Sequence, residues 1–197
     1  RSMKTHTGCA IAGMFAMGIH ESLSPMRPAP VSIRVVGNHF DNHVIGILLK
    51  KFQTLIPWKW LRGGDWKEGW NAKSYTIHLE NGSRISFRSS EQDVAKFAGD
   101  DLDMILGDEH MAKRYYIENK ARLVDRNGFY RHGLTLDLGS ISWEAKHWRE
   151  NAEKVRVYHF TMKGNPHISK AGQQEFMDSL RHDPTSYAIK VEGREVP

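Results

Sequence analysis

An apolar segment that ends in two adjacent acidic residues is the feature that most constrains the fold of this chain. Met104 to Leu106 form the apolar segment, and Gly107, Asp108 and Glu109 follow it directly. A helical pattern of apolar residues then runs from about Met111 to Val124. A buried strand of this kind carries its carboxylates to the carboxyl edge of a sheet, where ligands bind in open α/β folds. The chain is therefore expected to fold around such a sheet.

Further segments alternate between the periodicity of strands and that of helices. The strand-like segments are rich in β-branched residues or alternate polar with apolar positions, and they span 31–36, 75–79, 85–87, 133–138 and 155–160. The helix-like segments repeat apolar residues at intervals of three and four, and they span 5–23, 40–55 and 142–150. Asn81-Gly82 supplies the positive-φ turn of a hairpin. This order predicts a mainly parallel α/β sheet in a single domain.

The composition sets the class of protein and of partner. Lys and Arg number 28 against 23 Asp and Glu, a net charge of +5 that favours polyanionic partners. Cys9 is the only cysteine, so no intrachain disulfide can form and a reducing compartment is expected. The longest apolar stretch, around Cys9 to Ile19, is interrupted by glycines and is shorter than the roughly 20 residues of a membrane span. No membrane partner is expected.

The first residues match part of a phosphate-binding loop. Arg1-Ser2-Met3-Lys4-Thr5 leads directly into the first predicted helix, as in a P-loop. Ser2 and Lys4 would then bind the phosphates of ATP, and the Thr5 hydroxyl would bind Mg²⁺. Met3 stands where the pattern has Gly, and its first Gly would precede residue 1, so the chain is expected to begin within the loop. The alternative is an exposed first turn of an ordinary helix.

The acidic pair fits the second half of such a site. Asp108 would hold Mg²⁺ through its water shell, and Glu109 would polarise the attacking water as the catalytic base. The alternative is that Asp108 only caps the following helix while Glu109 interacts with its dipole.

An ordered set of motifs resembles the ATPase domain of the tailed-phage terminase large subunits, over essentially all 197 residues. The first group lies around the hairpin and the acidic strand: Asn81-Gly82-Ser83, Ile85, Phe87, Ser89, Gly99 and Asp108-Glu109. The second group follows it: Arg122-Leu123-Val124-Asp125, Gly128, Leu134-Thr135, Gly139, Trp143, Asn165-Pro166-His167-Ile168 and the segment 192–197. Leu136 replaces the usual Pro after Thr135.

The resemblance implies a P-loop NTPase (ASCE/RecA-like) three-layer fold that uses ATP and Mg²⁺ to move double-stranded DNA into a procapsid. It implies a pentameric ring at the portal protein, a small terminase subunit as partner, and assembly in the host cytoplasm. Residues 1–197 would be the motor domain, truncated within its Walker A loop and lacking the C-terminal RNase-H-like nuclease. Another P-loop motor such as a helicase, or a binding module without ATPase activity, remains the alternative.

The resemblance also implies roles for residues outside the two phosphate motifs. Thr135 would sense the γ-phosphate of ATP. Many members carry an arginine finger immediately before the glycine that corresponds to Gly99, where this chain has Ala98. Arg84 and Arg88 are the candidates for a finger that reaches a neighbouring subunit, and Arg1 could act within its own subunit.

Three other groups of residues invite a functional interpretation. Trp58, Lys59, Trp60 and Arg62 lie in a segment, 57–73, that is expected to be a loop, and they suit DNA contact, a partner surface or simple packing. The pair His39 and His43 has metal-ligand spacing but is expected to be exposed at the surface. The acidic group Asp100, Asp101 and Asp103 is expected to form a solvated loop rather than a nuclease metal site.

Overall fold

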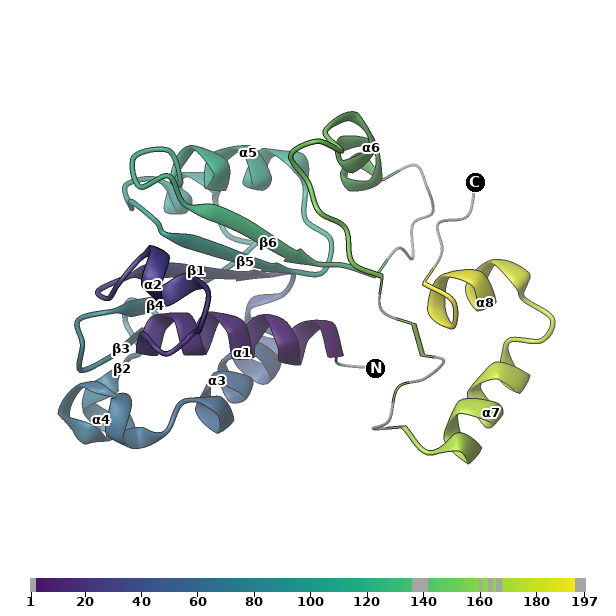
Figure 1. The fold of residues 1–197 in the computed structure, drawn as a ribbon, viewed down its shortest axis with the longest axis horizontal. Coiled ribbons are helices and arrows are strands. Elements are labelled where there is room, and N and C mark those ends of the chain that lie inside the picture. The colour runs from purple at the N-terminus through teal and green to yellow at the C-terminus, as the bar shows by residue number, and fades with distance from the viewer. Residues whose placement is uncertain (1–2, 136–141, 160, 163–164, 166–167, 194–197) are drawn as a thin grey trace. The chain divides into compact units, whose positions relative to one another are not determined.

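The structure is a computed structural model that describes residues 3–135, 142–159, 161–162, 165 and 168–193. Two compact units divide these residues. The first contains the described residues up to Leu134, and the second begins at Thr135. Figure 1 traces both units from the N-terminus to the C-terminus.

A mixed, mostly parallel sheet of six strands forms the centre of the first unit, counted over the described residues. In spatial order the strands are β2 (Trp70–Asn71), β3 (Thr76–His78), β4 (Arg84–Ser89), β1 (Ser32–Gly37), β5 (Met104–Asp108) and β6 (Phe129–Gly133). The four strands from β4 to β6 are parallel, and at one edge β3 pairs antiparallel with β4 and β2 pairs antiparallel with β3. The predicted α/β class and mainly parallel sheet are confirmed.

Helices cover both faces of this sheet and complete a three-layer arrangement (Figure 1). Helices α1 (Met3–Met17) and α3 (Lys50–Leu55) lie on one face, and α5 (Lys113–Ala121) lies on the other. A π-helix, η1 (Phe40–Leu49), leads directly into α3. The remaining short helices of this unit are α2 (Leu23–Met26), η2 (Trp58–Trp60), η3 (Arg62–Gly64), α4 (Trp66–Gly69) and η4 (Val94–Phe97).

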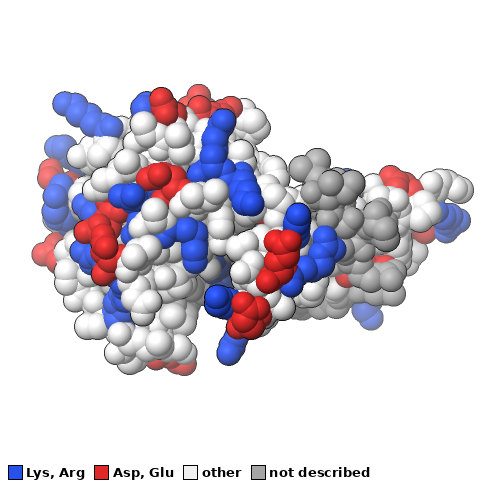
Figure 2. Space-filling model, turned by 90° about the horizontal axis from the view of Figure 1, so that it is seen from above, with Lys and Arg blue, Asp and Glu red and all other residues white. Residues whose placement is uncertain are grey.

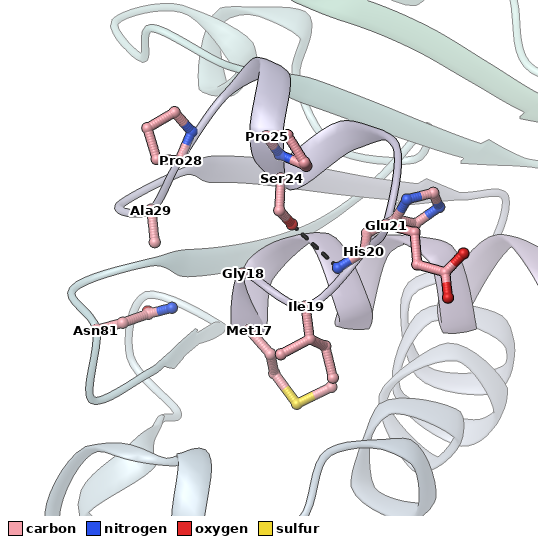
Figure 3. Close-up of a pocket in the computed structure, with 10 residues that line it drawn as sticks. All are labelled: Met17, Gly18, Ile19, His20, Glu21, Ser24, Pro25, Pro28, Ala29 and Asn81. Atoms are coloured by element: carbon pink, nitrogen blue, oxygen red, sulfur yellow. Dashed lines mark hydrogen bonds between the residues drawn. The ribbon is translucent and has the colours of Figure 1, made fainter.

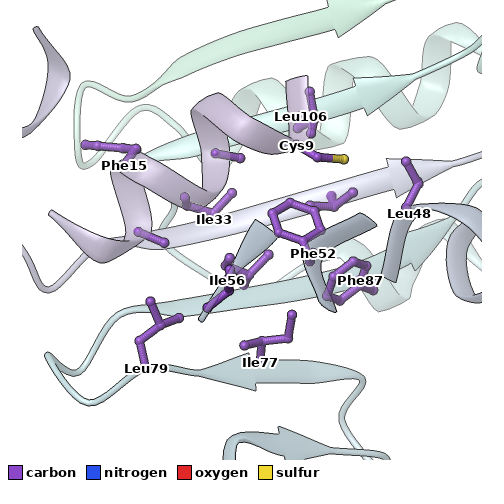
Figure 4. Packing of buried hydrophobic residues seen from close by; sticks show 14 of the residues in the cluster. Cys9, Phe15, Ile33, Leu48, Phe52, Ile56, Ile77, Leu79, Phe87 and Leu106 are labelled. Carbon is purple, nitrogen blue, oxygen red and sulfur yellow. The ribbon is translucent and has the colours of Figure 1, made fainter. Parts of the chain in front are cut away.

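The main hydrophobic core lies between the sheet and the layer of α1 and α3 (Figure 4). Strand β1 shows why: Ile33 and Val35 alternate with Arg34, so both apolar side chains point to the same face. Phe52 of α3 meets Phe87 of β4 edge to face, with 5.5 Å between ring centroids. Both rings are fully buried, so this contact fixes α3 to the centre of the sheet.

A buried arginine organises the opposite face. The guanidinium of Arg34 is fully buried and donates to the Phe97 carbonyl, the Asn119 side chain and the Asp100 carboxylate, at 2.8, 3.1 and 2.7 Å. Burial lowers the pKa of Arg34, and the hydrogen bond to Asp100 opposes that shift. A buried charge needs such partners, so Arg34 ties the loop before β5 to helix α5.

The hairpin between β3 and β4 forms as predicted. Gly82 has a φ of +83°, which the turn requires and which glycine adopts without steric cost. The side chain of Asn81 donates to the Ala16 carbonyl at 2.9 Å. The turn therefore also satisfies a carbonyl near the end of α1, where the helix itself leaves such groups unpaired.

Several predicted boundaries are wrong. The segment 57–73 is not a plain loop, because it forms η2, η3, α4 and β2. The helix predicted for 5–23 ends at Met17, and Gly18 follows with a φ of +76°. The strand predicted for 133–138 lies earlier in the chain, as β6 from Phe129 to Gly133, and residues 136–138 lie outside the described residues. Residues 155–159 do not form the predicted strand, and residue 160 is not described.

The second unit contains three described helices, α6 (Trp143–Glu150), α7 (Lys170–Ser179) and α8 (Pro184–Lys190). Ser142, Ser169 and Asp183 cap them, and each side chain accepts a backbone N–H of the first turn. The helix predicted for 142–150 is confirmed. Across the described parts of both units, no helix combines the length and the apolar character needed to cross a membrane.

Phe52→Ala tests the importance of the core contact between α3 and β4. Because Phe52 is fully buried, its truncation should lower the free energy of unfolding by about 3–5 kcal/mol. Trp58→Ala is the matched control, since Trp58 is 68% exposed and its loss should cost less than about 0.5 kcal/mol. Urea unfolding followed by far-ultraviolet circular dichroism measures both values. Equal losses would contradict this description of the core.

Candidate active site

The acidic pair lies where strand β5 ends, beside the amino end of α1 (Figure 1). Asp108 is the last residue of the strand, and it is only 2% exposed. Glu109 follows with a φ of +66°, an unusual backbone conformation for a residue other than glycine. Such a conformation costs about 1–3 kcal/mol and is concentrated at functional sites.

Strand β6 holds Glu109 in this conformation. The backbone N–H of Glu109 donates to the Gly133 carbonyl at 2.7 Å. The Glu109 carbonyl lies 2.8 Å from Nε2 of His132, which can donate to it. Both backbone groups of the strained residue are therefore hydrogen-bonded, and the direction of its side chain is fixed by the neighbouring strand.

The first turn of α1 brings a hydroxyl and an ammonium group to the two acids. Oγ1 of Thr5 lies 2.9 and 3.1 Å from the two carboxylate oxygens of Asp108. Nζ of Lys4 pairs with Oε1 of Glu109 at 3.0 Å. These contacts join segments that are 103 to 105 residues apart in the sequence. The structure thus brings together Lys4, Thr5, Asp108 and Glu109, four of the five residues that the two phosphate motifs predicted; the fifth, Ser2, lies outside the described residues.

Two glycines permit this close approach. A Cβ at Gly8 of α1 would lie 2.8 Å from Cδ1 of Leu106, so with a larger residue here either the Leu106 side chain or the helix would have to shift. A Cβ at Gly133 would lie 3.1 Å from the Asp108 carboxylate and 3.5 Å from Cβ of Lys4. Gly8 lies about one helical turn after Thr5, so its place on the same face of α1 can be read from the sequence.

His43 also binds Asp108, which the sequence analysis did not predict. Its Nε2 lies 2.9 Å from Oδ2 of Asp108, and its side chain is only 12% exposed. The expectation of a surface histidine is therefore wrong for His43. It is correct for His39, whose side chain is 66% exposed and pairs with Glu91. The two histidines are in the same helical region but face different surroundings.

Comparison with known proteins supports the fold. No protein-family model and no curated protein sequence matches the chain. The large terminase of a thermophilic bacteriophage, in complex with ADP, matches with a TM-score of 0.60 and 15% identity, over 94% of this chain and 45% of that one. This chain has the fold of part of a phage large terminase. At this identity the match confirms the predicted resemblance as a likeness of fold.

Two further structures of the same phage terminase match this chain to a similar degree. One has a TM-score of 0.63 and 14% identity, over 95% of this chain and 45% of that chain. The other, in complex with ATP-gamma-S, has a TM-score of 0.59 and 16% identity, over 94% and 45%. The chain thus spans a little under half of the length of the large terminases that it matches.

The other predicted site residues are not placed at this cluster. Arg1 and Ser2 lie outside the described residues. Thr135 begins the second unit, so its contact with a nucleotide stays a prediction. Arg84 donates to the Ser32 hydroxyl at the amino end of β4, and Arg88 donates to the carbonyls of Ser74 and Phe87. The role of either arginine as a finger also stays a prediction.

The acidic residues before β5 are not simply a solvated loop, which corrects the sequence interpretation. Asp103 is 3% exposed and forms ion pairs with Arg27 at 2.8 Å and Arg126 at 3.2 Å. Asp100 pairs with the buried Arg34, and only Asp101 is exposed. Arginine partners hold two of the three carboxylates, so the group is a structural ion-pair network.

The tryptophan-rich segment is mainly a packing element. Trp60, Trp66 and Trp70 pack against the core, whereas Trp58 is exposed to solvent, as are Lys59 and Arg62. On the face shown in Figure 2, basic and acidic side chains are interspersed rather than gathered into one continuous basic field. Contact of Trp58, Lys59, Trp60 and Arg62 with DNA or a partner protein stays a prediction.

A cavity of about 500 Å³ lies at the opposite end of α1 (Figure 3). It is lined by residues from the end of α1, the following turn and the β3–β4 hairpin, among them Met17, Ile19, His20 and Asn81. Ser24 accepts the His20 backbone N–H at 3.0 Å and shapes its rim. None of the four residues of the acidic and basic cluster lines it.

The reactivity of the Cys9 thiol depends on how closely α1 packs, because Cys9 is fully buried on this helix. Burial raises the pKa of its thiol from 9.0 to about 12, and the charge of Asp108 acts in the same direction, while Lys51 opposes it. At pH 8 the thiolate fraction should be roughly 1,000-fold smaller in the folded than in the unfolded protein. We therefore expect iodoacetamide to leave the native protein unmodified and to alkylate Cys9 rapidly in urea.

The same shift predicts a dependence of stability on pH. Because the folded-state pKa lies above the unfolded value, ionisation of Cys9 does not affect stability below about pH 9 and destabilises the fold as the pH rises from there toward 12.

For the alkylation by iodoacetamide, mass spectrometry measures the fraction of Cys9 that is modified. Equal rates of modification in buffer and in urea would show that α1 does not pack as described.

Proposed function

We propose that this chain binds ATP with Mg²⁺ where α1 meets the end of β5, and that it hydrolyses ATP to ADP and phosphate. One observation carries the proposal: the Thr5 hydroxyl lies against Asp108 while the Lys4 ammonium lies against Glu109. The fold of a large terminase supports it further, because the terminase of the thermophilic phage has been solved with ADP and with ATP-gamma-S.

The chemistry of Thr5 and Asp108 fits Mg²⁺. Both offer hard oxygen ligands, and Mg²⁺ usually takes only one or two protein oxygens together with waters and phosphates. When bound, Mg²⁺ would offset the negative charge of the phosphates.

During the reaction the ion pair between Lys4 and Glu109 would open, so that Lys4 binds the phosphates of ATP and Glu109 binds the attacking water. The ammonium of Lys4 pairs with Glu109 at 3.0 Å, and the phosphates of ATP would compete for it. Glu109 could then accept a proton from a water molecule as its oxygen attacks the γ-phosphorus. The bond from that phosphorus to the ADP oxygen breaks, which yields ADP and phosphate. The strained backbone of Glu109 keeps its carboxylate directed for this step.

We further propose that the full-length protein uses this reaction to drive double-stranded DNA into a procapsid. The proposed partners are the portal protein, a small terminase subunit and further copies of the chain in a pentameric ring, in the host cytoplasm. Thr135 would sense the γ-phosphate, with Arg1 acting in its own subunit and Arg84 or Arg88 in a neighbour. The resemblance in the motifs and the fold supports this part of the proposal.

Replacing each acid by its amide separates the two proposed roles. In the full-length protein, Glu109→Gln should preserve ATP binding and lower turnover by roughly 10² to 10⁴, the usual contribution of a positioned general base. Asp108→Asn should weaken binding of Mg²⁺-ATP as well as turnover, because it removes the charge next to the metal. Calorimetry and phosphate release measure the two quantities.

Asp101→Asn is the matched control, since it removes an exposed carboxylate near the same strand. It should leave binding and turnover unchanged. If wild-type protein binds Mg²⁺-ATP but never releases phosphate, the chain is a binding module. If Asp108→Asn and Glu109→Gln both retain wild-type turnover, the pair is only the end of a strand and the proposal is wrong.

A further inference from the structure

His43 is held beside Asp108 from a different element than Thr5. It lies in the π-helix η1, where the Val44 backbone N–H donates to the His39 carbonyl five residues earlier, at 2.9 Å. π-helical turns widen a helix locally and occur often at functional sites. Here the wide turn sets the imidazole 2.9 Å from Oδ2 of Asp108, with most of the ring shielded from solvent.

The hydrogen bonds of the ring define its tautomer. The backbone N–H of Asn38 donates to Nδ1 of His43 at 3.1 Å, so Nδ1 is an acceptor. Nε2 then carries the proton and donates it to the Asp108 carboxylate. One side of the ring is thus anchored to the backbone just after β1, and the other side orients the acid at the end of β5.

Gly37, the last residue of β1, makes room for this arrangement. A Cβ on Gly37 would lie 3.0 Å from Nδ1 of His43 and 3.0 Å from Cγ2 of Val44. Both contacts are tighter than ordinary van der Waals packing. The end of β1 therefore lacks a side chain at the point where η1 must bring the imidazole close to the sheet.

We propose that His43 is a positioning residue that holds the Asp108 carboxylate in the orientation required to bind a Mg²⁺-nucleotide; this inference rests on the proposed function. The Thr5 hydroxyl would turn from Asp108 toward the metal when it becomes a ligand. The imidazole would then be the remaining described side chain that orients the acid. Outer partners of this kind typically change metal affinity by 10- to 100-fold when they are removed.

A neutral donor suits this position. A Lys or Arg beside Asp108 would offset the carboxylate charge that attracts Mg²⁺, and Lys4 already brings one positive charge to the site. The tautomer set by Asn38 gives His43 one N–H to donate and no net charge. The acid is oriented while its charge remains available.

Three substitutions at position 43 separate positioning from a merely structural role. His43→Gln keeps an N–H donor near the place of Nε2, so it can still bind Asp108. His43→Asn keeps an acceptor near the place of Nδ1, so it can still bind Asn38 but is too short to reach Asp108. His43→Leu keeps neither. His39→Asn, at the exposed histidine of the same region, is the control.

Calorimetry with ADP, in the presence and absence of Mg²⁺, is the main measurement. We expect His43→Leu and His43→Asn to weaken Mg²⁺-ADP binding by roughly 10-fold or more. His43→Gln should recover most of the affinity, and His39→Asn should match wild type. Binding of ADP without Mg²⁺ should change by less than about 2-fold in all four variants, because His43 acts through the metal ligand. Thermal unfolding confirms that each variant is folded.

A spectroscopic measurement on the metal-free protein tests the geometry without nucleotide. Long-range ¹H–¹⁵N spectra should show His43 with its proton on Nε2, and Asp108→Asn should shift the Nε2 resonance. If wild-type protein binds no Mg²⁺-ADP, the proposed function itself fails. If wild type binds and His43→Asn binds as tightly as His43→Gln, or more tightly, only the inference about His43 is overturned. A proton on Nδ1 would overturn it as well.

Discussion

The hydrogen bonds between Thr5 and Asp108 connect helix α1, which carries Lys4, to the end of strand β5, where Asp108 and Glu109 lie. A carboxylate that is 2% exposed must have hydrogen-bond donors, because an isolated buried charge is strongly unfavourable. Thr5 supplies one donor from α1 and His43 supplies another from η1. The layer of helices is therefore bonded to the centre of the sheet at this acid, and the small residue Gly8 allows the helix to lie close enough.

The same contacts that stabilise the fold also form the proposed reaction site. Glu109 keeps an unfavourable backbone conformation because β6 binds both of its backbone groups. Its side chain is paired with Lys4, and in the proposed reaction the phosphates of ATP would compete for the Lys4 ammonium. Under the proposed function, binding of ATP would therefore change the contacts that the site makes without nucleotide. The resemblance to large terminases gives this change a proposed use in DNA packaging.

Much of this arrangement could be predicted from sequence, because it depends on local patterns. The apolar segment before Asp108, the Asn81-Gly82 turn and the start of α1 each have a periodicity or turn chemistry that sequence displays directly. His43 could not be found in this way, because its contact depends on a π-helix and on the space left by Gly37. The ion pairs of Asp103 could not be predicted either, because Arg27 and Arg126 are distant from it in the sequence.

A structure of the full-length protein with Mg²⁺ and ATP-gamma-S would test the account most directly. The account predicts the phosphates between the first turn of α1 and the end of β5, with Mg²⁺ near Thr5 and Asp108. Lys4 should have left Glu109 for the phosphates, and His43 should still donate to Asp108. A nucleotide bound elsewhere, or one bound while the Lys4–Glu109 pair stays intact at 3.0 Å, would contradict the central claim.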